Sequence, residues 1–257
     1  MKKLIVVLGL ALAACARQPG APDLGNVQSN APDTEVQQRA RAFTDLAAAY
    51  FQRGQFKVAL DELRKAILAD PKFSPAYNVY GLVYMELAED KLAEDYFRHA
   101  IDLDRSNSEA HNDYGRFLCT RGRYDDGLAQ FGAALRNPLY AAPEQAMANA
   151  GSCAEMKGDL ALAEANLMRA LKLQPDNPQT LIKLAALNFR LDKLAEAQRL
   201  LTRHGELAPA SAASLWLGVR LERKAGDRAQ EAAYGLQLRK HFPDSEEARA
   251  LLAGRYE

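Results

Sequence analysis

The sequence predicts an all-α protein, a right-handed superhelical solenoid of about six helix-turn-helix repeats. Units of similar sequence begin 34 residues apart, at Ala40, Ser74 and Ser108. Small residues recur at fixed offsets within each unit, and large apolar residues lie between them. Glycine-containing turns separate the helices of a unit, and no segment has the alternating pattern of a strand. Together these features indicate stacked helix pairs.

The small residues explain how the two helices of a unit pack. In the second unit, positions 8, 20 and 27 are Gly81, Ala93 and Ala100, which allow two antiparallel helices to approach closely. Large residues such as Tyr80 and Phe97 fill the remaining space. Each pair leaves one face uncovered, so neighbouring pairs must stack, and the first helices then line a concave groove.

This pattern resembles the tetratricopeptide repeat. Gly127 stands at position 20 of the third unit, where the consensus residue is alanine, and a two-residue slip near Pro143 precedes the fourth unit. The sixth unit is degenerate, and its register is open by one residue. We expect a solenoid over residues 40–257, with repeats near 40–73, 74–107, 108–141, 144–177, 178–210 and 211–245.

The N-terminus has the features of an export signal. Lys2 and Lys3 precede an apolar run, Leu4 to Ala14, that is too short to span a bilayer. Small residues then stand directly before Cys15, which resembles the bacterial lipobox, where the cysteine is acylated and becomes the first mature residue. We expect a lipoprotein signal peptide at residues 1–14 and lipidation of Cys15. The alternative is an ordinary signal peptide with a chance cysteine.

The residues after Cys15 bear on location. Such lipoproteins are usually retained in the inner membrane by an aspartate after the cysteine, and Ala16 stands there, so the resemblance implies the periplasmic face of the outer membrane. Acyl chains contribute about 0.8 kcal/mol per buried methylene, so several chains anchor a domain durably. Residues 15–39 are rich in proline, glycine and polar residues without periodicity, which predicts a flexible linker.

Composition argues against several classes of function. Loss of Lys2 and Lys3 with the signal changes 33 basic and 33 acidic residues to 31 and 33, a charge of about −2. The charges are interspersed, without the basic stripe that nucleic-acid binding needs. The sequence also lacks HExxH, GxSxG, a phosphate-binding glycine loop and CxxC. We expect no enzyme, cofactor, metal, nucleic acid or small-molecule substrate. The histidines lack metal-ligand spacing, and they are His99, His111, His204 and His241.

Two cysteines remain in the predicted solenoid. Cys119 and Cys153 fall in the first helices of consecutive units, which are neighbours in a solenoid. An even pair of cysteines in an exported domain favours a disulfide over free buried thiols. Two titratable thiols in the non-reduced protein would contradict the bridge.

The groove is the predicted partner-binding surface. Positions 2, 5, 9, 12 and 13 of each first helix face the concave side in such repeats, and they supply apolar groups and amide donors suited to an extended peptide or a helix. Phe51 and Met85 are the strongest candidates, because exposed apolar groups on a concave surface commonly mark interfaces. For each residue, solvation or packing between repeats is the alternative. The candidate residues are Thr44, Phe51, Gln52, Asn78, Leu82, Met85, Asn112, Arg116 and Met156.

A narrower resemblance covers essentially the whole mature chain. It is carried by the lipobox, by Tyr114-Gly115-Arg116-Phe117-Leu118-Cys119, by Asn137-Pro138-Leu139-Tyr140 between units three and four, and by Cys153 in Asn149-Ala150-Gly151-Ser152-Cys153. These features resemble the PilF/PilW family of type IV pilus biogenesis lipoproteins, sometimes called pilotins. Cysteines at the two family positions also favour the disulfide.

The resemblance implies a function. It predicts a protein that binds subunits of the outer-membrane secretin of the type IV pilus, brings them to that membrane and promotes their multimerisation. One alternative is another periplasm-facing repeat lipoprotein, an adaptor for barrel assembly or for peptidoglycan enzymes. A third is an enzyme whose site the sequence does not reveal. The neighbouring genes would separate the first two.

Overall fold

The computed structural model describes residues 34–256, and thirteen α-helices lie in this range. They are α1 (Glu35–Gln52), α2 (Phe56–Ala69), α3 (Ser74–Glu86), α4 (Asp90–Leu103), α5 (Ser108–Thr120), α6 (Tyr124–Ala134), α7 (Pro143–Lys157), α8 (Leu160–Leu173), α9 (Pro178–Arg190), α10 (Leu194–Leu207), α11 (Ala212–Ala225), α12 (Arg228–His241) and α13 (Glu246–Leu252). No strand is present in the described range.

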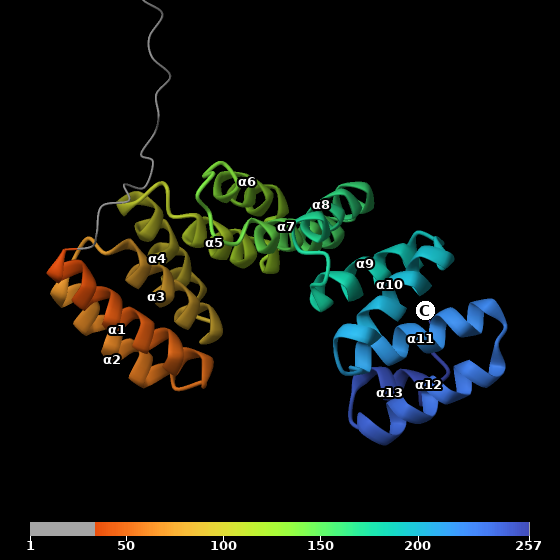
Figure 1. The fold of residues 1–257 in the computed structure, drawn as a ribbon. Helices are drawn as coiled ribbons and strands as arrows, with labels where there is room; N and C mark the ends of the chain where they lie inside the picture. The colour runs from red at the N-terminus through yellow and green to blue at the C-terminus, as the bar shows by residue number, and fades with distance from the viewer. Residues whose placement is uncertain (1–33, 257) are drawn as a thin grey trace, which may run out of the picture.

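Consecutive helices pair and the pairs stack along an arc (Figure 1). Helices α5 and α7 lie on the inside of the arc, and α6 and α8 lie on the outside. Packing between first helices continues from α1 through α3 and α5 to α7, and it is looser between α7 and α9. The predicted all-α solenoid is confirmed.

The first helix begins earlier than the sequence analysis placed it. Helix α1 starts at Glu35, so the predicted linker boundary at residue 39 is wrong. The reason is a capping box: Gln37 donates its backbone N–H to Thr34 Oγ1 at 3.2 Å, and Thr34 N–H donates to Gln37 Oε1 at 2.9 Å. The predicted signal peptide, Cys15 and the rest of the linker lie outside the described residues.

The glycines of the repeats explain how closely the paired helices pack. A Cβ added at Gly81 would lie 2.6 Å from the ring of Phe97, and one added at Gly151 would lie 2.7 Å from Leu167 Cγ. Both large side chains are fully buried in the core. The small residue at position 8 therefore makes room for the large residue at position 24 of the same unit.

The C-terminal end of the solenoid is covered by residues beyond the sixth unit. Helix α13 packs on α11 and α12. After it, the chain brings Tyr256 back to α11: Arg220 Nε donates to the Tyr256 carbonyl at 2.9 Å, and the Tyr256 ring stacks on Trp216 at 5.7 Å. Helix α13 and this tail cover the face that a further repeat would otherwise bury.

Ion pairs connect neighbouring repeats along the surface. Arg121 pairs with Asp90 at 2.6 Å, and Lys224 pairs with Asp192 at 2.6 Å. Exposed pairs of this kind contribute at most about 1 kcal/mol each. Some of the interspersed charges of the sequence therefore pair across neighbouring repeats, and the others lie on solvated helix faces.

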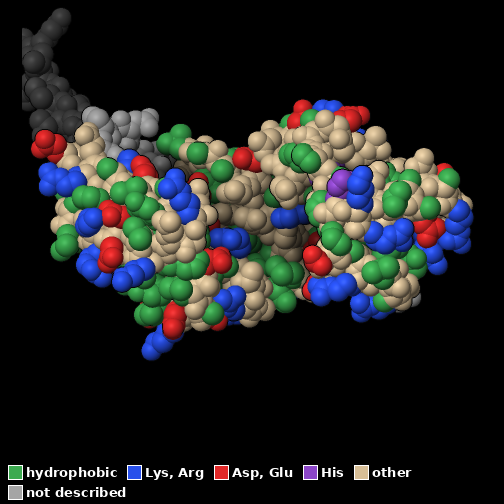
Figure 2. Space-filling model, turned by 90° about the horizontal axis from the view of Figure 1, so that it is seen from below, with side chains coloured by type: hydrophobic (Ala, Val, Ile, Leu, Met, Phe, Trp, Pro, Cys, Tyr) green, Lys and Arg blue, Asp and Glu red, His purple; other side chains and the backbone are tan. Residues whose placement is uncertain are grey.

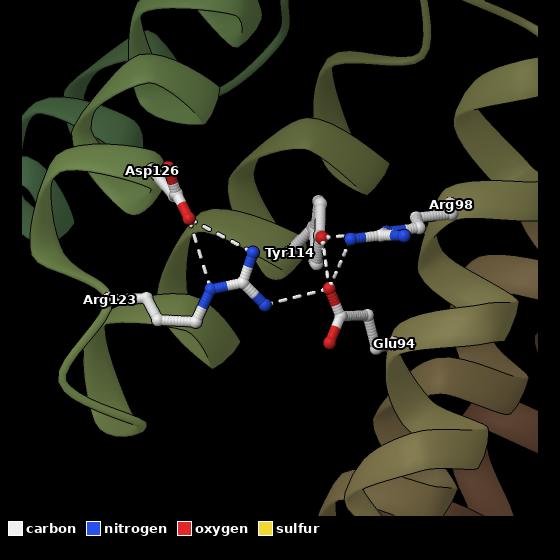
Figure 3. A network of polar contacts seen from close by, with 5 residues as sticks. All are labelled: Glu94, Arg98, Tyr114, Arg123 and Asp126. Atoms are coloured by element: carbon white, nitrogen blue, oxygen red, sulfur yellow. Dashed lines mark hydrogen bonds and ion pairs between the residues drawn. The ribbon is translucent and has the colours of Figure 1, made fainter.

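A denser polar network connects α4 with α5 and the start of α6 (Figure 3). Glu94 Oε1 accepts hydrogen bonds from Arg98 at 2.7 Å, from the Tyr114 hydroxyl at 2.8 Å and from Arg123 at 2.7 Å. Arg123 also pairs with Asp126 at 2.9 Å. Burial alone would raise the pKa of Glu94, but the hydrogen bonds from Arg123 and Tyr114 and the charge of Arg98 hold that pKa below its usual value.

This network predicts a pH-dependent stability. We expect Glu94→Gln to lower the free energy of unfolding by about 1 to 2 kcal/mol at pH 7, because it removes a charged acceptor from three donors. The folded pKa of Glu94 is depressed, so its ionised form stabilises the fold above the usual pKa of 4.5, and this contribution is lost as pH falls through the folded pKa. Urea unfolding at pH 7 and pH 3 measures the difference. Equal losses at both pH values would contradict the assignment, and Asp95→Asn, an exposed carboxylate on α4, is the matched control.

Candidate functional site

The candidate site is the concave surface formed by the first helix of each repeat, α1, α3, α5, α7, α9 and α11. Figure 2 looks onto the molecule from below the arc of Figure 1 and shows a surface hollowed near its middle, with both charge types on its walls. Because stacked helix pairs form a continuous framework, side chains on this face are held at fixed spacing.

Three predicted groove residues are buried, and they connect or support the first helices. Thr44 Oγ1 donates to the Ala40 carbonyl within α1 at 2.8 Å. Asn78 Nδ2 donates to Asp113 Oδ2 at 2.9 Å, which connects α3 to α5. Asn112 Oδ1 accepts from Asn149 Nδ2 at 3.0 Å, which connects α5 to α7. These two hydrogen bonds, Asn78–Asp113 and Asn112–Asn149, connect three successive first helices, and we refer to them as the amide ladder.

The apolar candidates are more covered than expected. Phe51 and Met85 are only partly exposed, so the expectation that they are exposed apolar groups is wrong. The Phe51 ring packs against Phe56 at 6.0 Å between centroids, and Leu82 and Met85 pack against the core around Phe97. These side chains support the inner wall of the groove.

The remaining candidates reach solvent. Gln52 is exposed, Met156 is 49% exposed, and the Arg116 side chain is 40% exposed with its guanidinium 3.8 Å from Asp113. Contact with a partner stays a prediction for every residue of the candidate set.

The amide ladder carries a prediction of its own. We expect Asn112→Ala to lower the free energy of unfolding by about 1 to 2 kcal/mol, because the Asn149 amide loses its acceptor at a site where Asn112 itself is only 2% exposed. Gln52→Ala, on the exposed end of α1, should change stability by less than about 0.5 kcal/mol. Denaturant unfolding of both variants tests this, and equal effects would show that the ladder bond adds nothing.

A disulfide joins Cys119 of α5 to Cys153 of α7, with Cα atoms 5.5 Å apart. Both cysteines are buried. The bridge explains the glycine at position 20 of the third unit, because a Cβ at Gly127 would lie 2.3 Å from Cys119 Sγ. The glycine thus makes room for the disulfide within repeat three, and the disulfide connects that repeat to repeat four.

The Asn-Pro-Leu-Tyr break lies between the same two repeats. Asn137 Nδ2 donates to the Ser106 carbonyl at 3.2 Å, and Leu139 N–H donates to Asn137 Oδ1 at 3.0 Å. Tyr140 is 8% exposed. The break is therefore an ordered turn, attached to the turn that precedes α5.

The first three repeats enclose an acidic cavity of about 390 Å³ on the concave side, which the sequence analysis missed. Burial raises the pKa of Asp113, opposed by the Asn78 hydrogen bond and the Arg116 charge. Asp113 stands at position 6 of its unit, where the second unit has Val79, and this exchange of valine for aspartate was the available signal. The cavity is lined by Arg41, Thr44, Asp45, Ala48, Pro75, Asn78, Val79, Asp104, Asn107, Glu109 and Asp113.

Three basic side chains, those of Lys183, Arg220 and Lys224, lie on the C-terminal first helices α9 and α11. Burial lowers the pKa of Lys183 on α9, and Glu155 opposes the shift. The Arg220 guanidinium lies 4.4 Å from the centroid of Phe189, and Lys224 Nζ lies 5.0 Å from it.

In residues 34–256, no cluster of three or more His, Cys, Asp or Glu side chains is arranged to hold a metal ion. No helix in that range combines the length and apolarity needed to cross a membrane. The ring nitrogens of His111 lie 2.7 Å from Gln130 Oε1 and 3.1 Å from the Arg105 carbonyl oxygen. These contacts give His111 a structural role.

The paired helices and their concave groove define a tetratricopeptide-repeat protein, and the tetratricopeptide repeat family matches residues 40–73, 74–107 and 144–177. The type IV pilus assembly protein PilF of Pseudomonas aeruginosa is 28% identical over 204 residues, which cover 79% of this chain and 81% of PilF. The chain belongs to the PilF/PilW family of type IV pilus biogenesis proteins.

Solved structures agree with this assignment. The structure of Pseudomonas aeruginosa PilF superposes with a TM-score of 0.77 at 28% identity, covering 86% of this chain and all (100%) of that one. PilW, described as a widely conserved type IV pilus biogenesis factor, also superposes with a TM-score of 0.77, at 30% identity and the same coverage of 86% and 100%. Repeat proteins of pilus systems bind protein partners.

Proposed function

We propose that this protein is an outer-membrane lipoprotein that binds secretin subunits at the periplasmic face and promotes their localisation and multimerisation for type IV pilus biogenesis. The observation that carries the proposal is membership of the PilF/PilW family together with a hollowed surface on the concave side of the first helices. A groove of fixed helices binds a segment of another protein without performing chemistry on it.

The cysteines support the compartment. A buried disulfide between Cys119 and Cys153 is suited to an oxidising environment such as the periplasm. Cys15 follows a signal-like apolar run and precedes Ala16, the sequence context of an outer-membrane lipoprotein. The lipid would determine where the protein is located, and the groove would bind the partner.

The first experiment deletes the gene and analyses outer membranes on non-denaturing gels for the secretin multimer. We expect multimers to disappear, with unassembled secretin left behind, and complementation with the wild-type gene to restore them. Normal multimers and normal pili in the deletion strain would overturn the proposal and would favour the adaptor alternatives.

Two variants at the N-terminus separate the effect of membrane location from the effect of partner binding. Cys15→Ala removes the lipid, and we expect it to bind secretin while leaving secretin mislocalised. Ala16→Asp keeps the lipid but supplies the inner-membrane retention residue, so we expect lipidated protein in the inner membrane and fewer multimers in the outer membrane. Full rescue by both variants would show that lipid-directed location is unimportant.

A further inference from the structure

The cavity between α1, α3 and α5 has an unbalanced charge. Four carboxylates line it, those of Asp45, Asp104, Glu109 and Asp113, against one guanidinium, that of Arg41. Asp104 Oδ1 already accepts from the backbone N–H and the hydroxyl of Ser106, at 2.9 and 2.6 Å. Arg116, outside the lining, lies 3.8 Å from Asp113, so four carboxylates stand against two cations and negative charge remains in excess.

A buried amide in the same wall has an unused acceptor. Asn78 is 6% exposed, and its Nδ2 donates to Asp113. Its Oδ1 has no hydrogen-bond partner within residues 34–256. A buried acceptor without a donor costs free energy, which an incoming donor would recover.

We propose that this cavity binds the cationic side chain of a lysine or arginine in an extended segment of the protein partner. An ammonium or guanidinium group carries only donors, and these match the carboxylates and the Asn78 acceptor. The inference rests on the proposed function only in taking the groove as the surface that holds a partner.

The ionisation of the lining supports the assignment. Burial raises the pKa of Glu109, and the neighbouring charge of Asp113 raises it further. Burial also raises the pKa of Asp113, opposed by the Asn78 hydrogen bond and by the charge of Arg116, whose guanidinium lies 3.8 Å from the carboxylate. A bound cation would lower both pKa values, because it stabilises the ionised carboxylates.

The cavity volume suits a side chain. About 390 Å³ is larger than a single ion requires, and the described residues include no cluster of three or more ligating side chains placed for a metal. The cavity also opens on the concave face, where an extended segment would place alternate side chains into pockets.

The direct test uses N-acetyl-arginine amide as the probe and N-acetyl-citrulline amide as its uncharged isostere, titrated into the mature chain and followed by amide NMR. We expect saturable shifts of the Asn78 side-chain amide and of α1, α3 and α5 with the arginine probe, and none with citrulline. Equal shifts with both probes, or no shift with either, would overturn the proposal.

Variants at the solvent side of the cavity localise the effect. Asp45→Asn combined with Glu109→Gln neutralises two carboxylates whose side chains reach solvent, so the helices should remain folded. We expect at least a fivefold weaker affinity for the arginine probe, and no change for Asp95→Asn on α4. Unchanged affinity in the double variant would overturn the proposal. The unfolding curve of each single variant checks that a weaker affinity is not caused by loss of the folded state.

A second readout connects the cavity to the partner. The double variant, with its lipid signal intact, should co-isolate less secretin and form fewer multimers than Asp95→Asn. If it binds the arginine probe weakly yet assembles secretin normally, the cavity does not hold the partner's cation and the inference fails. If the wild-type chain itself does not bind secretin, the proposed function fails, and the probe titration still decides the cavity.

Discussion

Replacing both Cys119 and Cys153 by alanine is expected to lower the free energy of unfolding by about 3 to 4 kcal/mol. The bridge closes a loop with a sequence separation of 34 residues, and its loss returns that loop's conformational freedom to the unfolded chain. It also removes a covalent connection between α5 and α7, where the groove passes from the third repeat to the fourth.

Urea unfolding followed by circular dichroism and by fluorescence measures this loss. Trp216 is the only tryptophan, and it lies on α11, away from the bridge, so its signal reports whether the C-terminal repeats unfold with the rest. A reductant should destabilise the wild-type protein by a similar amount and leave the double variant unchanged. A loss below about 1 kcal/mol would show that the loop is constrained in other ways.

Gly127→Ala is expected to cost about 2 to 3 kcal/mol, even though alanine favours helices. Its Cβ would lie 2.3 Å from Cys119 Sγ and 2.8 Å from the Gly115 carbonyl oxygen. Neither contact is relieved by rotating a flexible side chain end, because one atom belongs to a disulfide and the other to the backbone. Helix α6 must therefore move away from α5.

Gly132→Ala in the same helix is the matched control. Nothing lies within 4 Å of a Cβ added at Gly132, so this variant should gain about 0.5 to 1 kcal/mol from the lower entropy of the unfolded chain. Opposite signs for the two glycine variants, measured by urea unfolding, are the expected result. A gain in both would falsify the close approach at Gly127.

Both effects bear on function through the shape of the groove. Asn112 and Cys119 bond across the boundary between repeats three and four, and Gly127 packs against Cys119 from within repeat three. A change there should alter how the N-terminal half of the groove, with its acidic cavity, is placed relative to the C-terminal half. Partner binding and stability would then change together.

Much of the fold was readable because contacts within a unit repeat at short separations. Gly81 and Phe97 are 16 residues apart, and the same pairing recurs in Gly151 and Leu167. The start of α1 was misplaced, although Thr34 and Gln37 have the spacing of a capping box that the sequence already displayed. Because residues before 40 have few apolar side chains, the predicted linker extended to residue 39, past the true start of α1.

The groove was harder to read than the helices. Register placed Asn78, Asn112 and Met85 on the concave side, but it did not distinguish a reachable side chain from one already bonded to the next repeat. Asn78 meets Asp113 at a separation of 35 residues, and the Met85 side chain packs into the core beside Phe97. These outcomes depend on how far one repeat is rotated relative to the next.

The sequence by itself determined the helix pairs, the order of the repeats, the two cysteines that can meet and the family to which the chain belongs. Only the tertiary structure decided which groove residues remain open, that four carboxylates line one cavity, and that Tyr256 folds back over Trp216. The physical reason is the sequence separation of the contacts. Contacts within a pair follow from helix periodicity, whereas contacts between pairs follow from the accumulated rotation and translation of stacked units, which no local pattern specifies.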